Sequence, residues 1–545
     1  MPTYTSPIFQ AAARPGRETR HRVVVAGGGM VGLTAALDLA RRGIAVVVLN
    51  ATATVGAGSR AICMAKRSLE IFNRLGVGAR MLDKGVTWNR GEVLFRDRTV
   101  YRFDLLAEEG HHFPAFVNLQ QYYVEEYLVD ACRASGLVEL RWQHRVAAVA
   151  PAVGGMVLTV ETPEGPYRMA ADWLLACDGA HSTIRAGLGL DFVGQVFRDR
   201  FLIVDVVMDA AFPPIRRFWF HPPFHPDGSV LLHRQPDHLW RIDFRLGWDA
   251  DPEVERDLAR VRARVARMLG PEVRFEIEWI SVYTFRCRRL ERFRHGRILF
   301  LGDAAHQVSP FGARGGNAGV QDADNLGWKL AAVLGGSAPE RLLDSYDAER
   351  IPANDENILH STRSTDFITP KSDAARAYRD AVLELAEHYA FARALVNSGR
   401  LSRPAVLTES PLNTGDDAAW DGGVPPGSAA IDAPIGESGW LLDRLNRAPG
   451  FALLRFSGPE AASLPEIETI FVTPAPQAGA LHDRVGLVAR RYAAAAGDAI
   501  LFRPDQHVAA RWHRFDPEVV GAARDRALAR SPRAAQIEER VHAGA

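Results

Sequence analysis

The chain has 545 residues, 47% of them hydrophobic and 24% charged, and its acidic and basic residues balance to a formal net charge of zero. This length exceeds what one hydrophobic core supports, so we expect about three domains. The balanced charge, with no sustained basic patch, argues against nucleic acid or an anionic membrane as a partner.

The cysteines and the first residues bear on the cellular compartment. The four cysteines are far apart and form no CxxC pair, which argues against a disulfide framework, a zinc site or dithiol chemistry, and we predict no metal. Residues 1–20 contain no apolar core typical of a signal peptide, and no apolar run approaches the roughly 18 residues of a membrane span. We therefore expect a cytoplasmic protein.

The first predicted unit is a strand–helix–strand segment over residues 23–50. A β-branched strand enters a GxGxxG pattern, then a helix with one apolar face and a second strand follow. Gly27 would permit the tight turn, Gly29 would admit a pyrophosphate, and Gly32 would allow close helix–strand packing, with Met30 and Val31 between them. A glycine turn in another α/β fold is the alternative. Asn50 ends the second strand where an acidic residue would normally accept bonds from a ribose, so this contact is expected to be weaker.

Three further segments present polar residues at the ends of elements. Arg60 precedes an amphipathic helix and is a candidate phosphate ligand, with solvated surface charge as the alternative. Residues 92–103 predict a β-hairpin. Gln121 begins a helix that ends near Gly136, and it is either a ligand contact or an ordinary helix start. Asp178 follows a buried strand in a string that fits DGxxSxxR.

Residues 186–290 alternate apolar and polar residues, which predicts antiparallel strands and one helix near 253–269. Dense aromatic residues in these strands suit either a pocket for a planar molecule or a plain sheet core. Candidate acid–base or binding residues lie here, although an ordinary structural role is the alternative for each: His221, His225, His233, Arg241 and Tyr283.

A buried strand over 298–301 stops at Gly302, and Asp303 stands at its end. A glycine-rich segment that includes Gly316 and Asn317 then opens a helix of about 17 residues. A carboxylate in this position suits a hydroxyl-rich ligand, and the glycines let backbone N–H groups approach a flat one. A later helix is expected to end at Pro352. A Pro/Gly/Ser-rich passage then precedes an α/β unit from about residue 430.

The three motifs in this order resemble the flavin-dependent aromatic hydroxylases, in the branch of phenol hydroxylase and 3-(3-hydroxyphenyl)propionate hydroxylase. The resemblance implies an α/β fold with a Rossmann-type FAD-binding domain, an antiparallel-sheet substrate domain and a thioredoxin-like C-terminal domain. No cysteine follows Cys287, so that last domain would lack redox cysteines. The expected limits are an arm at 1–20, the FAD domain at 21–185 and 291–400 (with a helical segment), the substrate domain at 186–290, and the C-terminal domain at 401–545.

The resemblance also implies roles for residues. FAD would be held by the residues already named: Gly27, Gly29, Met30, Val31, Gly32, Asn50, Arg60, Gln121, Asp178, Asp303, Gly316 and Asn317. Asp178 belongs to a motif associated with both FAD and the nicotinamide donor, and Asp303 would bond the ribityl chain. The family commonly shows GxGxN before the last helix, whereas this chain has Ala313-Arg314-Gly315-Gly316-Asn317. Arg314 is thus either a contact for a substrate carboxylate or phenolate or part of a structural ion pair.

The implied activity is hydroxylation of a phenolic or hydroxyaryl-acid substrate with NADH or NADPH and O2, through a flavin C4a-hydroperoxide. The candidate catalytic residues are His233, Arg241 and Arg314, and a homodimer is a candidate assembly. One alternative is an FAD-dependent reductase or dehydrogenase that inserts no oxygen. Another is a non-catalytic flavin-binding protein.

Overall fold

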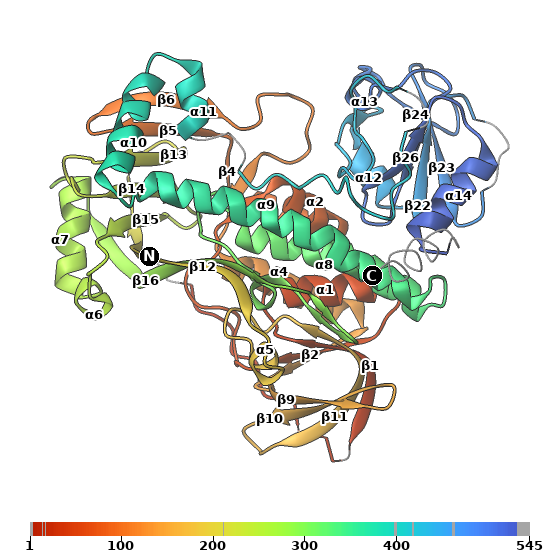
Figure 1. Cartoon of the computed structure of the whole chain (residues 1–545), viewed down its shortest axis with the longest axis horizontal. Helices are drawn as coiled ribbons and strands as arrows, with labels where there is room; N and C mark the ends of the chain where they lie inside the picture. The colour runs from red at the N-terminus through yellow and green to blue at the C-terminus, as the bar shows by residue number, and fades with distance from the viewer. Residues whose placement is uncertain are drawn as a thin grey trace, which may run out of the picture.

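The computed structural model describes residues 4–13, 15–16, 18–210, 212–396, 401–416, 419–459 and 464–530. Three larger sheets organise these residues, and each belongs to a different part of the molecule (Figure 1). A small three-stranded sheet, β3 (Cys63–Ala65), β7 (Phe116–Asn118) and β4 (Val86–Trp88), lies beside the helices α2 (Lys66–Arg74) and α3 (Gly78–Lys84).

The first large sheet is the predicted nucleotide-binding sheet. Its order is β17-β18-β11-β1-β2-β8, with β9 and β10 attached through β11. The strands are β1 (Thr19–Ala26), β2 (Val46–Asn50), β8 (Val138–Trp142), β9 (Arg145–Ala152), β10 (Gly155–Glu161), β11 (Tyr167–Ala176), β17 (Arg294–His295) and β18 (Ile298–Phe300). The run β18, β11, β1, β2, β8 is parallel, so the ends of β1, β11 and β18 meet at one edge of the sheet. The helices α1 (Met30–Arg41), α4 (Gln121–Ser135) and α8 (Gly315–Leu334) pack together beside it.

The second large sheet has the order β19-β16-β12-β15-β14-β13-β5-β6. Its strands are β5 (Arg90–Phe95), β6 (Arg98–Asp104), β12 (Phe192–Met208), β13 (Arg216–Phe220), β14 (Ser229–Arg234), β15 (Leu239–Leu246), β16 (Phe275–Leu290) and β19 (His306–Gln307). The predicted antiparallel pairing holds from β19 to β13, and β13 then pairs in parallel with β5 of the predicted hairpin. The helices α6 (Pro252–Glu255) and α7 (Leu258–Leu269) fall where one helix was predicted.

The helix expected to end at Pro352 does not end there. The helix α9 (Asp344–Ile368) runs through Pro352 for another four turns. Tertiary contacts on both sides of the proline hold it: Arg350 donates to Asp322, and Thr365 donates to Ser309. These buried bonds offset the backbone hydrogen bond that a proline removes. Further on lie α10 (Asp373–Ala386) and α11 (Ala390–Val396).

The C-terminal part contains a five-stranded mixed sheet with the order β24-β23-β22-β25-β26. Its strands are β22 (Phe451–Arg455), β23 (Ile467–Thr473), β24 (Ala480–His482), β25 (Ala499–Phe502) and β26 (Val508–Trp512), with the helices α12 (Leu441–Leu445), α13 (Leu487–Tyr492) and α14 (Pro517–Ala527) beside them. The thioredoxin-like assignment and the domain limits stay predictions. In the described part of the chain, no helix combines the length and apolarity needed to cross a membrane.

Candidate functional site

The glycine loop after β1 has no room for side chains. Gly27 has φ +109°, and a Cβ there would lie 2.2 Å from the carbonyl oxygen of Cys177. A Cβ on Gly32 would lie 2.0 Å from the carbonyl oxygen of Gly27. The loop therefore makes the tight turn, and α1 approaches β1 closely, as the spacing predicts for a dinucleotide site.

The N-terminus of α1 is held by a carboxylate that the sequence reasoning missed. Glu125 on α4 accepts hydrogen bonds from the N–H groups of Met30 (3.1 Å) and Gly56 (2.6 Å). Burial raises the pKa of Glu125, while Gln121 and these two N–H groups lower it. For the next two N–H groups, those of Val31 and Gly32, the described residues supply no acceptor. This first helical turn thus keeps donors for an anion such as a pyrophosphate.

Asn50, Arg60 and Gln121 surround the same loop. The amide oxygen of Asn50 accepts from the N–H of Gly28 (3.1 Å), so the side chain steadies the glycine loop itself. Gln121 accepts from the N–H of Ala61 (3.1 Å) and donates to Glu125 (2.7 Å). Arg60 is exposed, and its charge lowers the pKa of both Glu125 and Asp303. An exposed guanidinium between two carboxylates that lie on different elements suits the phosphate contact predicted for Arg60.

The DGxxSxxR string folds back on itself at the end of β11. Asp178 accepts from the N–H of Ile184 (3.2 Å), and Ser182 caps α5 (Thr183–Gly187) by accepting from the N–H of Arg185. Arg185 donates to the carbonyl oxygens of Ala180 and Ala304, which ties this turn to the next strand end. The other carboxylate oxygen of Asp178 is buried without a partner in the structure, so it is available to a ligand.

Asp303 stands at the end of β18, beside the Asp178 turn. Asp303 is exposed, although much protein lies around its carboxylate. The surrounding protein raises its pKa, and His306 and Arg60 lower it. Behind it, the fully buried Asp322 accepts from the N–H of Gly302 (3.0 Å) and from His306 (2.6 Å). This network fixes the turn that presents Asp303 to a ligand.

The start of α8 meets the start of α1. A Cβ on Gly316 would lie 2.9 Å from the side chain of Met30, and one on Gly319 would lie 2.6 Å from that of Val31. Asn317 accepts from the N–H of Ala65 (2.9 Å) and donates to the carbonyl oxygen of Cys63 (2.9 Å), which joins α8 to β3. Among the residues that the structure describes, no side chain caps α8, so its first N–H groups remain open to a ligand oxygen.

Ala313 stands where the family's GxGxN pattern commonly has its first glycine, and Arg314 stands at the variable position after it. Ala313 adopts φ +54°, a left-handed conformation that favours glycine. Arg314 is buried and donates to the carbonyl oxygen of Phe311 (2.9 Å). The side chain therefore braces the loop before α8, and its contact with a substrate stays a prediction.

The candidate catalytic residues of the second sheet lie on paired positions of β14 and β15. His233 and Arg241 are cross-strand partners. Arg241 forms an ion pair with Asp243 (2.9 Å) and donates to the carbonyl oxygen of Arg60 (2.8 Å), which joins this sheet to the cofactor side. His233 is buried, and both its burial and the charges of Arg216 and Arg241 lower its pKa. A neutral His233 follows from these surroundings.

Arg216 on β13 belongs to this cluster and was not singled out from the sequence. It lies within electrostatic range of Cys63, Asp243 and Tyr101, yet the described residues give its guanidinium no hydrogen bond, and its Nε is buried. Its only sequence signal was its place in the alternating segment 216–220. His221 and His225, in contrast, bond the carbonyl oxygens of Pro226 and Arg245 and have structural roles.

Aromatic rings close the space next to this cluster. Phe201, Phe285 and Phe311 pack with ring centroids 4.8 to 5.2 Å apart, and Phe311 leads into α8. Trp88 stacks on Phe116 at 4.9 Å. Tyr283 lies in the same sheet, half exposed and within electrostatic range of Asp303. Apolar walls and a few polar groups suit an organic ligand of planar shape.

The predicted FAD residues therefore converge on one site that fits FAD. The first turns of α1 and α8 offer N–H donors for the pyrophosphate and the ring, and Asp303 offers an exposed carboxylate for a hydroxyl chain. A side chain in place of Gly27 or Gly32 would collide with the backbone of the loop. The assignment of each residue to a part of FAD stays a prediction.

Comparisons with known proteins agree with this geometry. The family model described as FAD binding domain matches residues 20–360. The chain is 32% identical over 525 residues to a 6-methylpretetramide 4-monooxygenase from Streptomyces rimosus, covering 90% of this chain and 91% of that protein. It is 31% identical over 375 residues to a para-nitrophenol 4-monooxygenase from Pseudomonas sp. (strain WBC-3), covering 67% and 91%.

Solved structures share the fold along most of the chain. The flavin-dependent monooxygenase PieE in complex with FAD and substrate aligns with a TM-score of 0.79 at 22% identity, over 94% of this chain and 99% of that one. The predicted fold class, FAD cofactor and family resemblance are thus confirmed, and a monooxygenase is favoured over the reductase and non-catalytic alternatives. The chain belongs to the FAD-binding-domain family and is an FAD-dependent monooxygenase.

Proposed function

We propose that this enzyme hydroxylates a phenolic ring that binds as an anion, with NADH or NADPH as the electron donor and O2 as the oxygen source. The observation that carries the substrate class is Arg216, a guanidinium without a protein partner in a cluster of aromatic and polar residues. Arg216 is partly exposed, but its Nε is buried without an acceptor among the described residues, and a phenolate or carboxylate would supply that acceptor.

Contacts between neighbouring residues connect this cluster to the cofactor. Cys63 is within electrostatic range of Arg216, and its carbonyl oxygen accepts from Asn317 in the first turn of α8. Arg241 bonds the backbone of Arg60 on the other side. A ring held by Arg216 would therefore lie near the start of α8, where the flavin ring is predicted.

When bound, FAD supplies the redox chemistry that transfers electrons from the nicotinamide donor and activates O2. The chain's own residues bind the phenolic substrate, orient it and shield it from water. Arg216 stabilises the ionised form of the phenol, which is the more electron-rich form, and the ring cluster around Phe311 excludes water. Neutral His233, within electrostatic range of Arg216, has an Nδ1 that lacks a partner among the described residues and can accept a hydrogen bond from the ligand.

The relatives support a phenolic substrate. They are named for activity on 6-methylpretetramide and para-nitrophenol, and para-nitrophenol is an acidic phenol. Phenols, hydroxyaryl acids and fused-ring phenols therefore form the test panel. We further propose a homodimer and a cytoplasmic location. Light scattering of the purified protein tests whether it is a homodimer.

The decisive experiment replaces Arg216 by Met. We expect KM for the best phenol to rise about tenfold or more, because one charge-assisted bond is lost, while FAD content stays unchanged. Arg217→Met is the matched control: Arg217 is the next residue on β13, points to the opposite face, and pairs with Glu92. Equal KM values in both variants would remove Arg216 from the proposal.

Isotope labelling tests the reaction class itself. With 18O2 as the oxygen source, mass spectrometry of the product should find one labelled oxygen atom. NAD(P)H consumption without labelled product would favour the reductase alternative, and bound FAD with neither activity would favour the non-catalytic one.

A further inference from the structure

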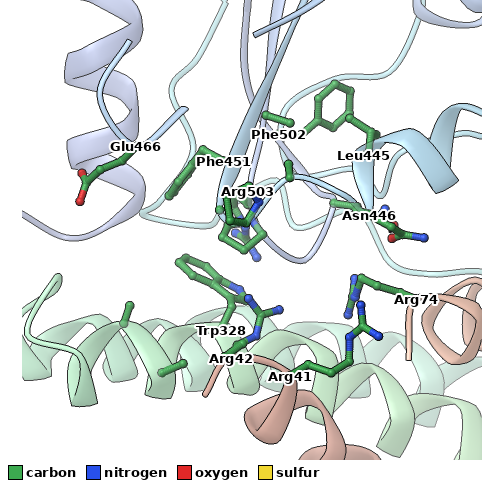
Figure 2. Close-up of a pocket in the computed structure, with 18 of the residues that line it drawn as sticks. Arg41, Arg42, Arg74, Trp328, Leu445, Asn446, Phe451, Glu466, Phe502 and Arg503 are labelled. Carbon is green, nitrogen blue, oxygen red and sulfur yellow. Dashed lines mark hydrogen bonds between the residues drawn. The ribbon is translucent and has the colours of Figure 1, made fainter. Parts of the chain in front are cut away.

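A cavity lies between the helices of the nucleotide-binding part and the C-terminal sheet, away from the predicted flavin site (Figure 2). Its volume is about 540 Å³, within the range of small-molecule sites. Arg41, Arg42, Arg74 and Trp328 line one side, and residues of the C-terminal part, including Phe451 and Arg503, line the other. α1 separates this cavity from the glycine loop, because Arg41 is its last residue and lies about 16 Å along the helix from Met30.

The lining is strongly cationic: six arginines face two carboxylates. Both carboxylates already have partners, since Asp38 pairs with Arg42 (3.0 Å) and Glu466 pairs with Arg530 (2.7 Å). The charge of Arg503 is compensated as well, by two buried carboxylates behind the cavity wall. These pairs compensate Arg42, Arg530 and Arg503. Of the other three arginines, Arg74 also has carboxylate partners, Asp324 and, at 3.7 Å, Asp38.

The remaining three are Arg41, Arg74 and Arg447. Arg41 and Arg447 come from opposite walls and are exposed, and their side chains have no hydrogen bond or ion pair to the described residues. Arg74 is only 7% exposed and pairs with Asp324, yet its Nε and Nη1 are buried without an acceptor. Positive charge at the C-terminal end of α1 has an ordinary explanation in the helix dipole, but that explanation does not cover Arg447 or the unpaired donors of Arg74.

The wall between these arginines is apolar. Trp328 and Phe451 meet edge to face, with ring centroids 6.2 Å apart, and Leu445 and Phe502 lie beside them. Each of these side chains is at most 4% exposed, so the apolar strip that reaches the cavity is narrow. A ligand that satisfies the whole cavity therefore carries negative charge first, with an organic group that meets this strip. Inorganic anions would meet only the arginines.

We propose that this cavity binds an organic phosphate of nucleotide size, with the phosphates between Arg41, Arg74 and Arg447 and the base against the Trp328–Phe451 wall. Phosphate oxygens accept several guanidinium bonds at once, which matches donors that converge from both walls. Bound there, the ligand links the C-terminal part to α1 and α8. The proposal does not depend on the hydroxylation reaction.

Calorimetric titration of the FAD-loaded enzyme with ADP, pyrophosphate and adenosine tests it. We expect ADP to bind more tightly than pyrophosphate and adenosine not to bind measurably. The double variant Arg41→Gln/Arg447→Gln should weaken ADP binding by about tenfold or more, while Arg267→Gln, an exposed arginine of α7, should leave it unchanged.

Several outcomes would overturn the proposal. Absence of ADP binding to the native enzyme excludes the site. Equal ADP affinity in the native enzyme and the double variant places ADP elsewhere, for example where the nicotinamide donor binds. Each single variant, Arg41→Gln or Arg447→Gln, repeats the test with a smaller expected loss, and unchanged FAD content and NAD(P)H oxidation show that the variants are folded.

Discussion

Replacing Glu349 by Gln should destabilise the whole molecule, because Glu349 anchors the C-terminal part through a buried charge network. Its carboxylate accepts from Lys329 (2.6 Å), Asn325 (2.6 Å) and Arg503 (3.2 Å). Burial would raise the pKa of Glu349, yet Arg503 and Lys329 hold it well below its ordinary value. The carboxylate is therefore ionised at neutral pH, and its loss removes the main group that compensates the buried charges of Lys329 and Arg503.

Removing one partner of a buried pair costs about 3–5 kcal/mol, and we expect that loss in the free energy of unfolding at neutral pH, measured with urea. Burial lowers the pKa of Lys329 to about 8, so the Lys329–Glu349 attraction fades as the pH rises through that value. The difference in the free energy of unfolding between the native enzyme and the variant should then decrease as the pH rises from about 7 to about 9.

Glu340→Gln is the matched control, since Glu340 makes an ion pair with Arg294 but is 46% exposed. Such a surface pair contributes about 0–1 kcal/mol. If Glu349→Gln cost no more than Glu340→Gln, the network would not be what holds the C-terminal part in place.

Three further predictions concern the cofactor site. Gly32→Ala should lower FAD occupancy and cost about 1–3 kcal/mol of stability, because its Cβ would lie 2.0 Å from the Gly27 oxygen. The ratio of visible to ultraviolet absorbance measures the occupancy. Full occupancy would show that the loop can move to accommodate the side chain. Ala313→Gly should raise the melting temperature through a gain of up to about 1 kcal/mol, since it relieves φ +54°, and a lower melting temperature would contradict this. Asp205 on β12, next to the cofactor side, accepts a hydrogen bond from Ser59 (2.9 Å). Burial raises the pKa of Asp205 to about 6, against the lowering effect of Arg241. The native state thus binds the extra proton between about pH 4 and 6, and the stability that this group contributes falls as the pH rises through that window. Asp205→Asn should flatten that part of the urea stability profile, and an unchanged slope would refute the assignment.

Local patterns in the sequence predicted the glycine loop and the strand ends of the candidate site, for a physical reason. The tight turn at Gly27, the close packing at Gly32 and the exposed Asp303 each depend on a few consecutive residues at the end of a strand. The parallel order of β1, β11 and β18 then brings these strand ends together. The glycine spacing indicates the tight turns, and the apolar runs indicate the buried strands whose ends meet.

Residues that act through distant partners were not predictable in this way. Glu125 reaches the start of α1 from a helix 95 residues later in the chain. Arg216 is identified by the absence of a partner, which only packing reveals. The helix α9 continues through Pro352 because hydrogen bonds to Asp322 and Ser309 hold it on both sides. The sequence around Pro352 shows only the proline, which usually ends a helix.

The position of Glu125 has a consequence for how the enzyme acquires its cofactor. By bonding Met30 and Gly56, this carboxylate holds the glycine loop and the start of α1 in their final geometry with protein groups alone. The loop needs no ligand to order it, so little of the binding free energy of FAD is consumed in reorganising the chain. Apoenzyme prepared by removing FAD should accordingly reload rapidly, as a rigid receptor does.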